Sequence, residues 1–368
     1  MSFDAASQAN TATRGLRAYD PGHDLPVLRQ RFGATIAELG SNENPLGPSP
    51  LAMTAARSAL AEVHRYPDPR GSALKTVLAR RLDVGTDRVV LGNGSHELLM
   101  LLAQCFADAA HAVVYSQYGF AVFALAAAAS GASAVVVPAL PVDHPTAPLG
   151  HDLDAIAAAL DNDTRLVYLA NPNNPTGSWF DDAALAAFLQ RVPQHVLVVV
   201  DEAYREYVDA PGLGSALAFA EWHPNLVVTR TFSKAYGLAG LRVGYAVAHP
   251  TVITVLERLR ESFNVNGVAL AAAAAALGDH GHLARVHAFN RSERAWLATE
   301  LARRGYRTLP SQTNFLLLTL ATPAAALERH LFERGVIVRP MAGYGLAHTL
   351  RISIGSHAEN LRLLGALP

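Results

Sequence analysis

The sequence has little cysteine and little charge, and neither sign of charge is in excess. Cys105 is the single cysteine among 368 residues, which excludes a disulfide framework and any multi-cysteine metal or iron–sulfur site. The chain carries 30 Lys and Arg against 31 Asp and Glu. It therefore lacks the excess of basic residues that would indicate nucleic-acid binding. Its first residues are polar and lack a hydrophobic segment, so we expect no secretory signal and a cytoplasmic protein.

One uncharged stretch, residues 112–142, is long enough to span a bilayer. It contains two glycines and two prolines, however, and much of it is alanine. It is better interpreted as a turn, a buried helix over about 120–130 and a buried strand at 134–137. We therefore expect no membrane partner.

Short apolar runs alternate with helical patterns between residues 60 and 250. The runs are continuous in Val and Leu, which is typical of strands covered on both faces and hence of a mostly parallel sheet. The alternation predicts an α/β fold. The runs lie at 89–91, 134–137, 166–170, 196–200, 226–229 and 243–247.

A length of 368 residues predicts two or three domains, and the 51% of hydrophobic residues suffices for a large core. The pattern of the sequence changes after residue 267. An alanine-rich helix and a long charged helix precede two further strands, which indicates a smaller α+β domain. We divide the chain into an N-terminal arm (1–40) that joins the small domain, a large domain (41–267) and a small domain (268–368).

Polar motifs follow four of the apolar runs. Ligands of open α/β sheets bind beyond the carboxyl ends of the strands, so these motifs are expected to form one site. They supply a glycine turn, an amide, a carboxylate with a phenol, and a lysine with hydroxyls. Their sequences are Gly92-Asn-Gly-Ser-His-Glu97, Asn171-Pro-Asn-Asn-Pro-Thr-Gly177, Asp201-Glu-Ala-Tyr204 and Arg230-Thr-Phe-Ser-Lys234.

The glycine turn and the residues after Arg230 suit a phosphate group. The turn opens a helix and offers backbone N–H groups to an anion. Glu97 stands where a dinucleotide fingerprint has its third glycine, and no P-loop lysine follows, so nucleotide binding is disfavoured. Thr231, Ser233 and Arg242 add hydroxyl and guanidinium donors.

The other motifs suit a pyridine ring. A lysine that ends a buried strand is desolvated, which lowers its pKa and makes Lys234 a candidate Schiff-base nucleophile. Asp201 could hold a proton on a ring nitrogen, while Tyr204 and Asn174 could donate to a ring oxygen. Together with a phosphate site, these groups describe pyridoxal 5′-phosphate.

These motifs, with 231–244, resemble those of the fold type I aminotransferases of class I and II. Within that group the chain is similar to the histidinol-phosphate aminotransferases, and the similarity runs from about residue 19 to 356. It implies a mostly parallel central sheet flanked by helices, plus a smaller α+β domain. The further motifs are Ser41-Asn-Glu-Asn-Pro-Leu-Gly-Pro48, Arg65-Tyr-Pro-Asp-Pro69, Gly335-Val-Ile-Val-Arg-Pro340 and Leu350-Arg-Ile-Ser353.

The resemblance also implies cofactor contacts. Lys234 would bond the cofactor covalently and shuttle the substrate proton, Asp201 would pair with the pyridine nitrogen, and Tyr118 would stack on the ring. Asn174 and Tyr204 would bond its phenolic oxygen. The family usually has an acidic or amide residue where this chain has His96. A contact of the phosphate with the backbone N–H group of His96 would be kept despite this change. The implied phosphate ligands are Ser95, His96, Thr231, Ser233 and Arg242.

The remaining implied contacts concern the substrates and a second subunit. Tyr66 would reach the phosphate bound by the neighbouring subunit, which implies a homodimer with shared sites. Arg351 would bind a substrate carboxylate and Arg339 the phosphate of histidinol phosphate, with Tyr19 closing over it and Asn44 also in the substrate site. The implied reaction is transamination between L-histidinol phosphate and 2-oxoglutarate, giving imidazole-acetol phosphate and L-glutamate, in histidine biosynthesis.

Three alternatives stay open. An aromatic or broad-range aminotransferase would use the same scaffold without phosphate selection by Arg339. An amino-acid phosphate decarboxylase or a carbon–sulfur lyase would share Lys234 and Asp201. A cofactor-binding DNA regulator is disfavoured because the sequence shows no N-terminal helix-turn-helix and no basic patch. The pair His280 and His282 is better interpreted as part of a polar loop than as a metal site.

Overall fold

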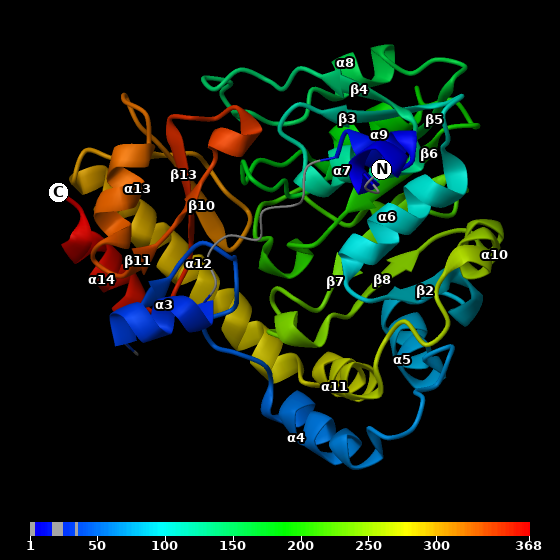
Figure 1. Ribbon diagram of the computed structural model, residues 1–368, viewed down its shortest axis with the longest axis horizontal. Coiled ribbons are helices and arrows are strands. Elements are labelled where there is room, and N and C mark those ends of the chain that lie inside the picture. Colours follow the sequence, from blue (N-terminus) through cyan, green and yellow to red (C-terminus); the bar gives the residue numbers. More distant parts are fainter. Residues whose placement is uncertain (1–3, 17–24, 34–35) are drawn as a thin grey trace.

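The computed structural model describes residues 4–16, 25–33 and 36–368, which form two parts (Figure 1). The larger part is built on a seven-stranded sheet in the order β2-β8-β7-β6-β5-β3-β4. β8 is antiparallel to both of its neighbours, and the other neighbouring pairs are parallel. The predicted mostly parallel sheet is therefore confirmed. The strands are β2 (Val89–Gly92), β3 (Ala112–Ser116), β4 (Ser133–Val137), β5 (Thr164–Ala170), β6 (Leu197–Asp201), β7 (Leu226–Thr231) and β8 (Gly244–Val247).

Two differences from the sequence prediction lie at one edge of this sheet. The segment expected to be a turn forms β3, because its apolar side chains are buried between β5 and β4. β4 was expected to be buried, but it pairs only with β3 and ends the sheet. Four of its five residues are exposed or half-buried as a result.

Helices cover both faces of the sheet (Figure 1). One face packs against α6, α7 and α10, through side chains such as Leu98, Val122 and Ile253. The other face packs against α8 and α9, through Ile156 and Leu185. Within the described residues, no helix is long and apolar enough to cross a membrane. The helices of this part are α4 (Pro50–Ala59), α5 (Ser72–Leu82), α6 (Ser95–Phe106), α7 (Ala121–Ser130), α8 (Leu153–Ala158), α9 (Asp182–Leu189), α10 (Pro250–Leu259) and α11 (Gly267–Gly278).

The smaller part is α+β. Its antiparallel sheet has the order β12-β13-β10-β9, and β1 pairs in parallel with β11 beside it. Leu297, Leu316 and Leu363 belong to one core that joins these strands to the helices. The elements are β1 (Ala37–Glu38), α12 (His280–Arg303), β9 (Arg307–Thr308), β10 (Phe315–Thr319), α13 (Ala325–Phe332), β11 (Val336–Ile337), β12 (Arg339–Pro340), β13 (Thr349–Ser353) and α14 (His357–Ala366).

The packing of α11 bears on the predicted boundary between the large and small domains. α11 was expected in the small domain, but its buried alanines share a core with α4 and α5 of the large part. The boundary after the large domain is therefore better placed at α12, which runs from α11 into the smaller part (Figure 1). In the N-terminal arm, α1 (Ala5–Gln8) and α2 (Thr11–Arg14) precede α3 (Leu25–Phe32). α2 contacts α7 of the large part, whereas the Phe32 ring of α3 packs edge-on against Phe332, 5.5 Å between centroids.

Candidate active site

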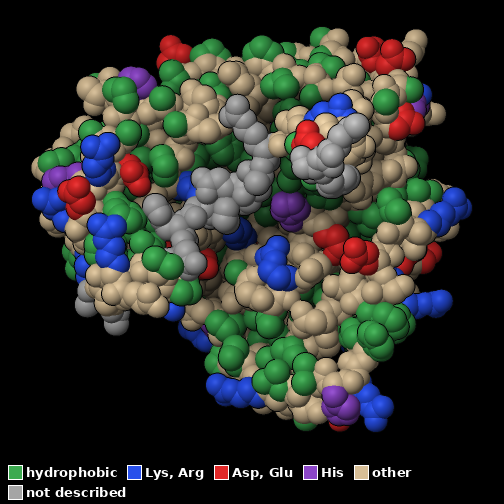
Figure 2. All heavy atoms as spheres, viewed as in Figure 1, with side chains coloured by type: hydrophobic (Ala, Val, Ile, Leu, Met, Phe, Trp, Pro, Cys, Tyr) green, Lys and Arg blue, Asp and Glu red, His purple; other side chains and the backbone are tan. Residues whose placement is uncertain are grey.

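A cavity of about 940 Å³ lies between the two parts, at the carboxyl ends of β5, β6 and β7. Figure 2 shows a hollow there, with Lys or Arg and His side chains gathered around it. Parallel strands bring their carboxyl ends to the same edge, so motifs far apart in the sequence meet in this cavity. The predicted site residues that line it are Ser95, His96, Asn174, Asp201, Tyr204, Thr231, Ser233, Lys234, Arg242, Arg339 and Arg351.

Three other predicted site residues, Tyr118, Asn44 and Tyr66, do not line the cavity. Tyr118 is half-buried and packs against a cluster with Leu317 and Met341, while Phe120 lines the cavity in its vicinity. Asn44 donates from Nδ2 to the carbonyl of Ala235 at 2.9 Å, so it holds backbone beside the cavity. Tyr19 lies outside the described residues.

Tyr66 is on the surface of the chain. Its side chain is 82% exposed, and its ring stacks on Phe263 with 4.7 Å between centroids. It does not line the cavity of its own chain. The predicted contact of Tyr66 with a ligand phosphate is therefore not one with the cavity of its own chain.

Lys234 presents its amine to the segment that follows β1. Nζ donates to the carbonyls of Asn42 at 3.3 Å and Ser41 at 3.4 Å. Burial lowers the pKa of Lys234 to about 8, and the positive charge of Arg351 adds to that effect. Because the neutral amine is the nucleophilic form, a substantial fraction of Lys234 can react with a carbonyl group near pH 8.

Asp201 ends β6 and is 4% exposed. Its Oδ1 accepts a hydrogen bond from Oγ1 of Thr229 on β7 at 2.9 Å. Burial raises the pKa of Asp201 to about 7, because the charged form loses its hydration. A positively charged N–H group in the cavity would stabilise the carboxylate, so the residue suits a protonated ring nitrogen.

The start of α6 forms a cradle for an anion. Its N-cap, Gly94, has a φ of 84°, and a Cβ atom there would lie 2.4 Å from Nη2 of Arg242. A Cβ atom on Gly244 would lie 2.5 Å from the backbone nitrogen of Ser95. Glycine at both positions therefore leaves room for a guanidinium group and free N–H groups to converge, which is the chemistry of a phosphate site.

The side chains around this cradle support the same interpretation. Arg242 donates from Nη1 to Oγ of Ser233 at 3.1 Å, which orients its guanidinium group. Burial lowers the pKa of His96, and the positive charge of Arg242 lowers it further. His96 is therefore neutral near pH 7, and Arg242 supplies the positive charge.

Two arginines lie on neighbouring strands of the small part. Arg339 on β12 and Arg351 on β13 are register partners, and both line the cavity. Arg351 donates from Nη1 to Oδ1 of Asn174 at 2.7 Å and from Nη2 to the carbonyl of Gly40 at 2.6 Å. With its oxygen bound to Arg351, Asn174 has its amide N–H group to donate. Two guanidinium groups here suit a ligand with one or two anionic groups.

Sequence reasoning missed Asn42, which connects several parts of the site. Its Nδ2 donates to the hydroxyl of Tyr204 at 3.0 Å, and its carbonyl accepts from Lys234. Oγ of Ser353 accepts from its backbone nitrogen at 2.8 Å. Asn42 has a φ of 55°, a conformation that asparagine adopts more readily than most residues. The available signal was the pair of asparagines in the Ser41–Pro48 motif, from which the prediction took Asn44.

Comparison with known proteins gives consistent results. The model of the family "Aminotransferase class I and II" matches residues 34–367. A Pseudomonas fluorescens protein named histidinol-phosphate aminotransferase 2 is 48% identical over 370 residues, covering 100% of this chain and 98% of the relative. Histidinol-phosphate aminotransferase 1 of Nitrosococcus oceani is 45% identical and covers 98% of this chain and 95% of the relative.

A solved structure is also similar over the whole chain. It is the histidinol-phosphate aminotransferase of Sinorhizobium meliloti in complex with pyridoxal 5′-phosphate. It is 32% identical, with a TM-score of 0.88, and the match covers 100% of this chain and 98% of that one.

The raised pKa of Asp201 predicts a pH-dependent effect of Asp201→Asn on the protein without bound ligand. The buried charge destabilises the wild-type fold only above the ordinary carboxyl pKa, and fully above about pH 7. The variant should therefore be more stable at pH 8, by about 1–4 kcal/mol, with the difference vanishing towards pH 4. Thermal unfolding across pH measures this, with the exposed Asp143→Asn as the control. A difference that does not change with pH would contradict the assignment.

Proposed function

The chain belongs to the class I and II aminotransferase family, and from that premise we propose that it catalyses transamination between L-histidinol phosphate and 2-oxoglutarate. The products are imidazole-acetol phosphate and L-glutamate, in histidine biosynthesis. One observation carries the proposal: a single cavity contains a lysine with a lowered pKa, a buried carboxylate, an anion cradle and two arginines. The names of the relatives agree with it.

The residues of the cavity fit pyridoxal 5′-phosphate. The cradle at the start of α6, with Arg242 and Ser233, would hold its phosphate, and the room left by Gly94 and Gly244 supports this fit. Asp201 would hold a proton at the ring nitrogen. When bound, this cofactor withdraws electrons from the carbon atom that carries the substrate amine.

Lys234 has two tasks in this proposal. Its neutral amine would bond the cofactor, which the lowered pKa favours. Once the substrate amine has replaced it on the cofactor, Nζ would take the proton from Cα of the substrate. It would then deliver that proton to C4′ of the cofactor. The carbonyls of Ser41 and Asn42 lie within 3.4 Å of Nζ, so they can orient the amine for that transfer.

Arg339 and Arg351 would bind the anionic ends of both substrates. The amino donor carries a phosphate group and the 2-oxo acid carries carboxylates, so the same pair of guanidinium groups can serve each in turn. This suits a reaction in which the two substrates occupy one cavity alternately. An aromatic or broad-range aminotransferase is the competing function, in which Arg339 does not select a phosphate group.

We also propose that the active protein is a cytoplasmic homodimer. Tyr66 and two neighbouring apolar side chains, Leu60 and Val63, are more than half exposed in the single chain. A second copy of this chain would cover them and would allow Tyr66 to reach the phosphate bound by its partner. A single cysteine, free in this fold, suits a reducing compartment.

Covalent labelling tests the role of Lys234. Lys75 is the other lysine of the chain, so a labelled peptide identifies the attachment site without ambiguity. After incubation with pyridoxal 5′-phosphate and borohydride reduction, mass spectrometry should find the cofactor on Lys234. Lys234→Ala should lose both the label and glutamate formation, whereas Lys75→Arg should keep both. Turnover by Lys234→Ala would contradict the mechanism.

Kinetics of Arg339→Ala test phosphate selection. Loss of a charged hydrogen bond should reduce transition-state stabilisation by on the order of 2 kcal/mol. This lowers kcat/KM for histidinol phosphate about 30-fold. The value for phenylalanine, which has no phosphate group, should change far less. Steady-state assays with both donors measure the ratio, and equal losses would favour the aromatic or broad-range alternative.

A further inference from the structure

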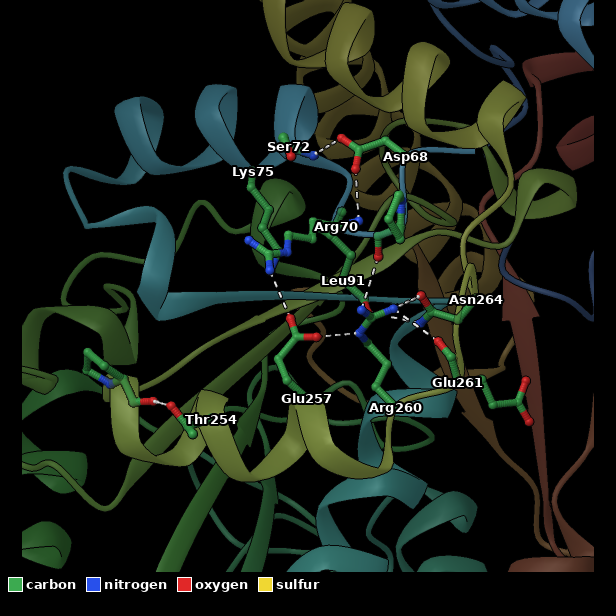
Figure 3. A network of polar contacts seen from close by, with 12 residues as sticks. Asp68, Arg70, Ser72, Lys75, Leu91, Thr254, Glu257, Arg260, Glu261 and Asn264 are labelled. Carbon is green, nitrogen blue, oxygen red and sulfur yellow. Dashed lines mark hydrogen bonds and ion pairs between the residues drawn. The ribbon is translucent and has the colours of Figure 1, made fainter. Parts of the chain in front are cut away.

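A network of polar contacts lies beside the anion cradle, with Arg260 at its centre (Figure 3). Arg260 donates from Nε to Glu257 at 2.8 Å, from Nη2 to the carbonyl of Pro69 at 3.0 Å and from Nη1 to Oδ1 of Asn264 at 2.8 Å. Lys75 of α5 donates to the second oxygen of Glu257 at 3.0 Å. The network therefore joins the end of α10, the segment before α5 and the segment before α11.

Asn264 connects this network to the cradle. Its Nδ2 donates to the carbonyl of Leu91 on β2 at 3.1 Å and to Oε1 of Glu97 at 2.9 Å. Oε2 of Glu97 accepts from the backbone nitrogen of Asn93, which directly precedes Gly94. One carboxylate thus holds the turn that begins α6 against the segment before α11.

The chemistry of Glu97 indicates why a carboxylate is required. Both of its oxygens face donors, Asn264 on one side and the Asn93 N–H group on the other. An amide in its place would turn an NH₂ group towards one of these donors. A negative charge close to a phosphate site is unfavourable for binding, so its presence is best explained by a positioning role. The Glu97 carboxylate accepts from the backbone N–H group of Asn93, so the backbone N–H groups of the residues after Asn93 remain for the ligand.

The same network holds the segment that carries Tyr66. Oδ1 of Asp68 accepts from the backbone nitrogen of Arg70 at 2.9 Å, and its Oδ2 from that of Ser72 at 2.7 Å. Arg260 holds the carbonyl of Pro69, and Phe263 stacks on Tyr66. The cradle is therefore joined by hydrogen bonds to the backbone segments that carry the stacked Tyr66–Phe263 pair.

We propose that Glu97 and Asn264 are positioning residues for the cofactor phosphate, and that they hold the cradle in register with the Tyr66–Phe263 pair. This inference rests on the proposed function, because it requires a phosphorylated cofactor in the cavity. Neither residue lines that cavity, so each acts through the backbone of the Asn93–Ser95 turn.

Binding of two forms of the cofactor by Glu97→Gln tests the inference. Pyridoxal lacks the phosphate group, so a positioning defect in the cradle should not affect it. We expect the Kd for pyridoxal 5′-phosphate to rise fivefold or more, and the Kd for pyridoxal to stay within twofold of wild type. Glu261→Gln is the matched control, since its carboxylate is exposed and takes no part in the network drawn in Figure 3. Absorbance titrations of the cofactor-free wild type and both variants measure these six dissociation constants.

A second variant keeps the test decisive if Glu97→Gln does not fold. Asn264→Ala removes the donor while leaving the carboxylate, and it should show the same selective loss for the phosphorylated ligand. Equal losses for both ligands, or none, would overturn the inference. Failure of the wild-type protein to bind pyridoxal 5′-phosphate would instead overturn the proposed function, so the two failures are distinguishable.

Discussion

The burial of two opposite charges, on Lys234 and Asp201, is the constraint on which the site depends. Each group loses hydration, and each pKa moves towards neutrality, to about 8 for the amine and about 7 for the carboxyl. Near pH 8 a substantial fraction of the Lys234 amine is neutral, as a nucleophile and proton acceptor requires, and a protonated ring nitrogen beside Asp201 would stabilise its carboxylate. The same burial destabilises the empty fold, so a ligand that neutralises both groups stabilises it. The buried apolar residues of β5, β6 and β7 offset this cost, and these strands hold both residues at one edge of the sheet.

The two parts of the molecule are joined through the site itself. Arg351 of the small part bonds Asn174 of the large part, and Asn42 bonds both Ser353 and Tyr204. Substrate recognition by the small part is therefore coupled directly to groups placed around the cofactor position. A change in the relative orientation of the two parts would therefore move Arg351 together with the carbonyls of Ser41 and Asn42 that orient Lys234.

Much of the site could be predicted because strand-end motifs in a parallel sheet meet by topology. That is why Asp201, Asn174 and Lys234 line one cavity although they lie far apart in sequence. The strands themselves were recognisable from continuous valine runs. β3 was missed because its short apolar run lies in the uncharged stretch 112–142, whose first part was assigned to a turn before the alanine-rich helix.

Other features of the site and the fold depend on choices that residue type does not decide. Asn42 and Asn44 share one motif, and only tertiary contacts show which of them reaches Tyr204. The alanines of α11 fit either domain by composition, and packing against α4 decides between them. The stacking of Tyr118 on the cofactor ring stays a prediction, and its half-buried side chain packs with Leu317 and Met341.

A single-turnover absorbance measurement tests the central claim, that one cavity holds the cofactor and selects a phosphorylated amino donor. The protein loaded with pyridoxal 5′-phosphate would be mixed with histidinol phosphate or with phenylalanine, without any 2-oxo acid. The account predicts rapid conversion to the amine form of the cofactor by histidinol phosphate, much slower conversion by phenylalanine, and recovery when 2-oxoglutarate is added. Faster conversion by phenylalanine, or no conversion by histidinol phosphate, would contradict it.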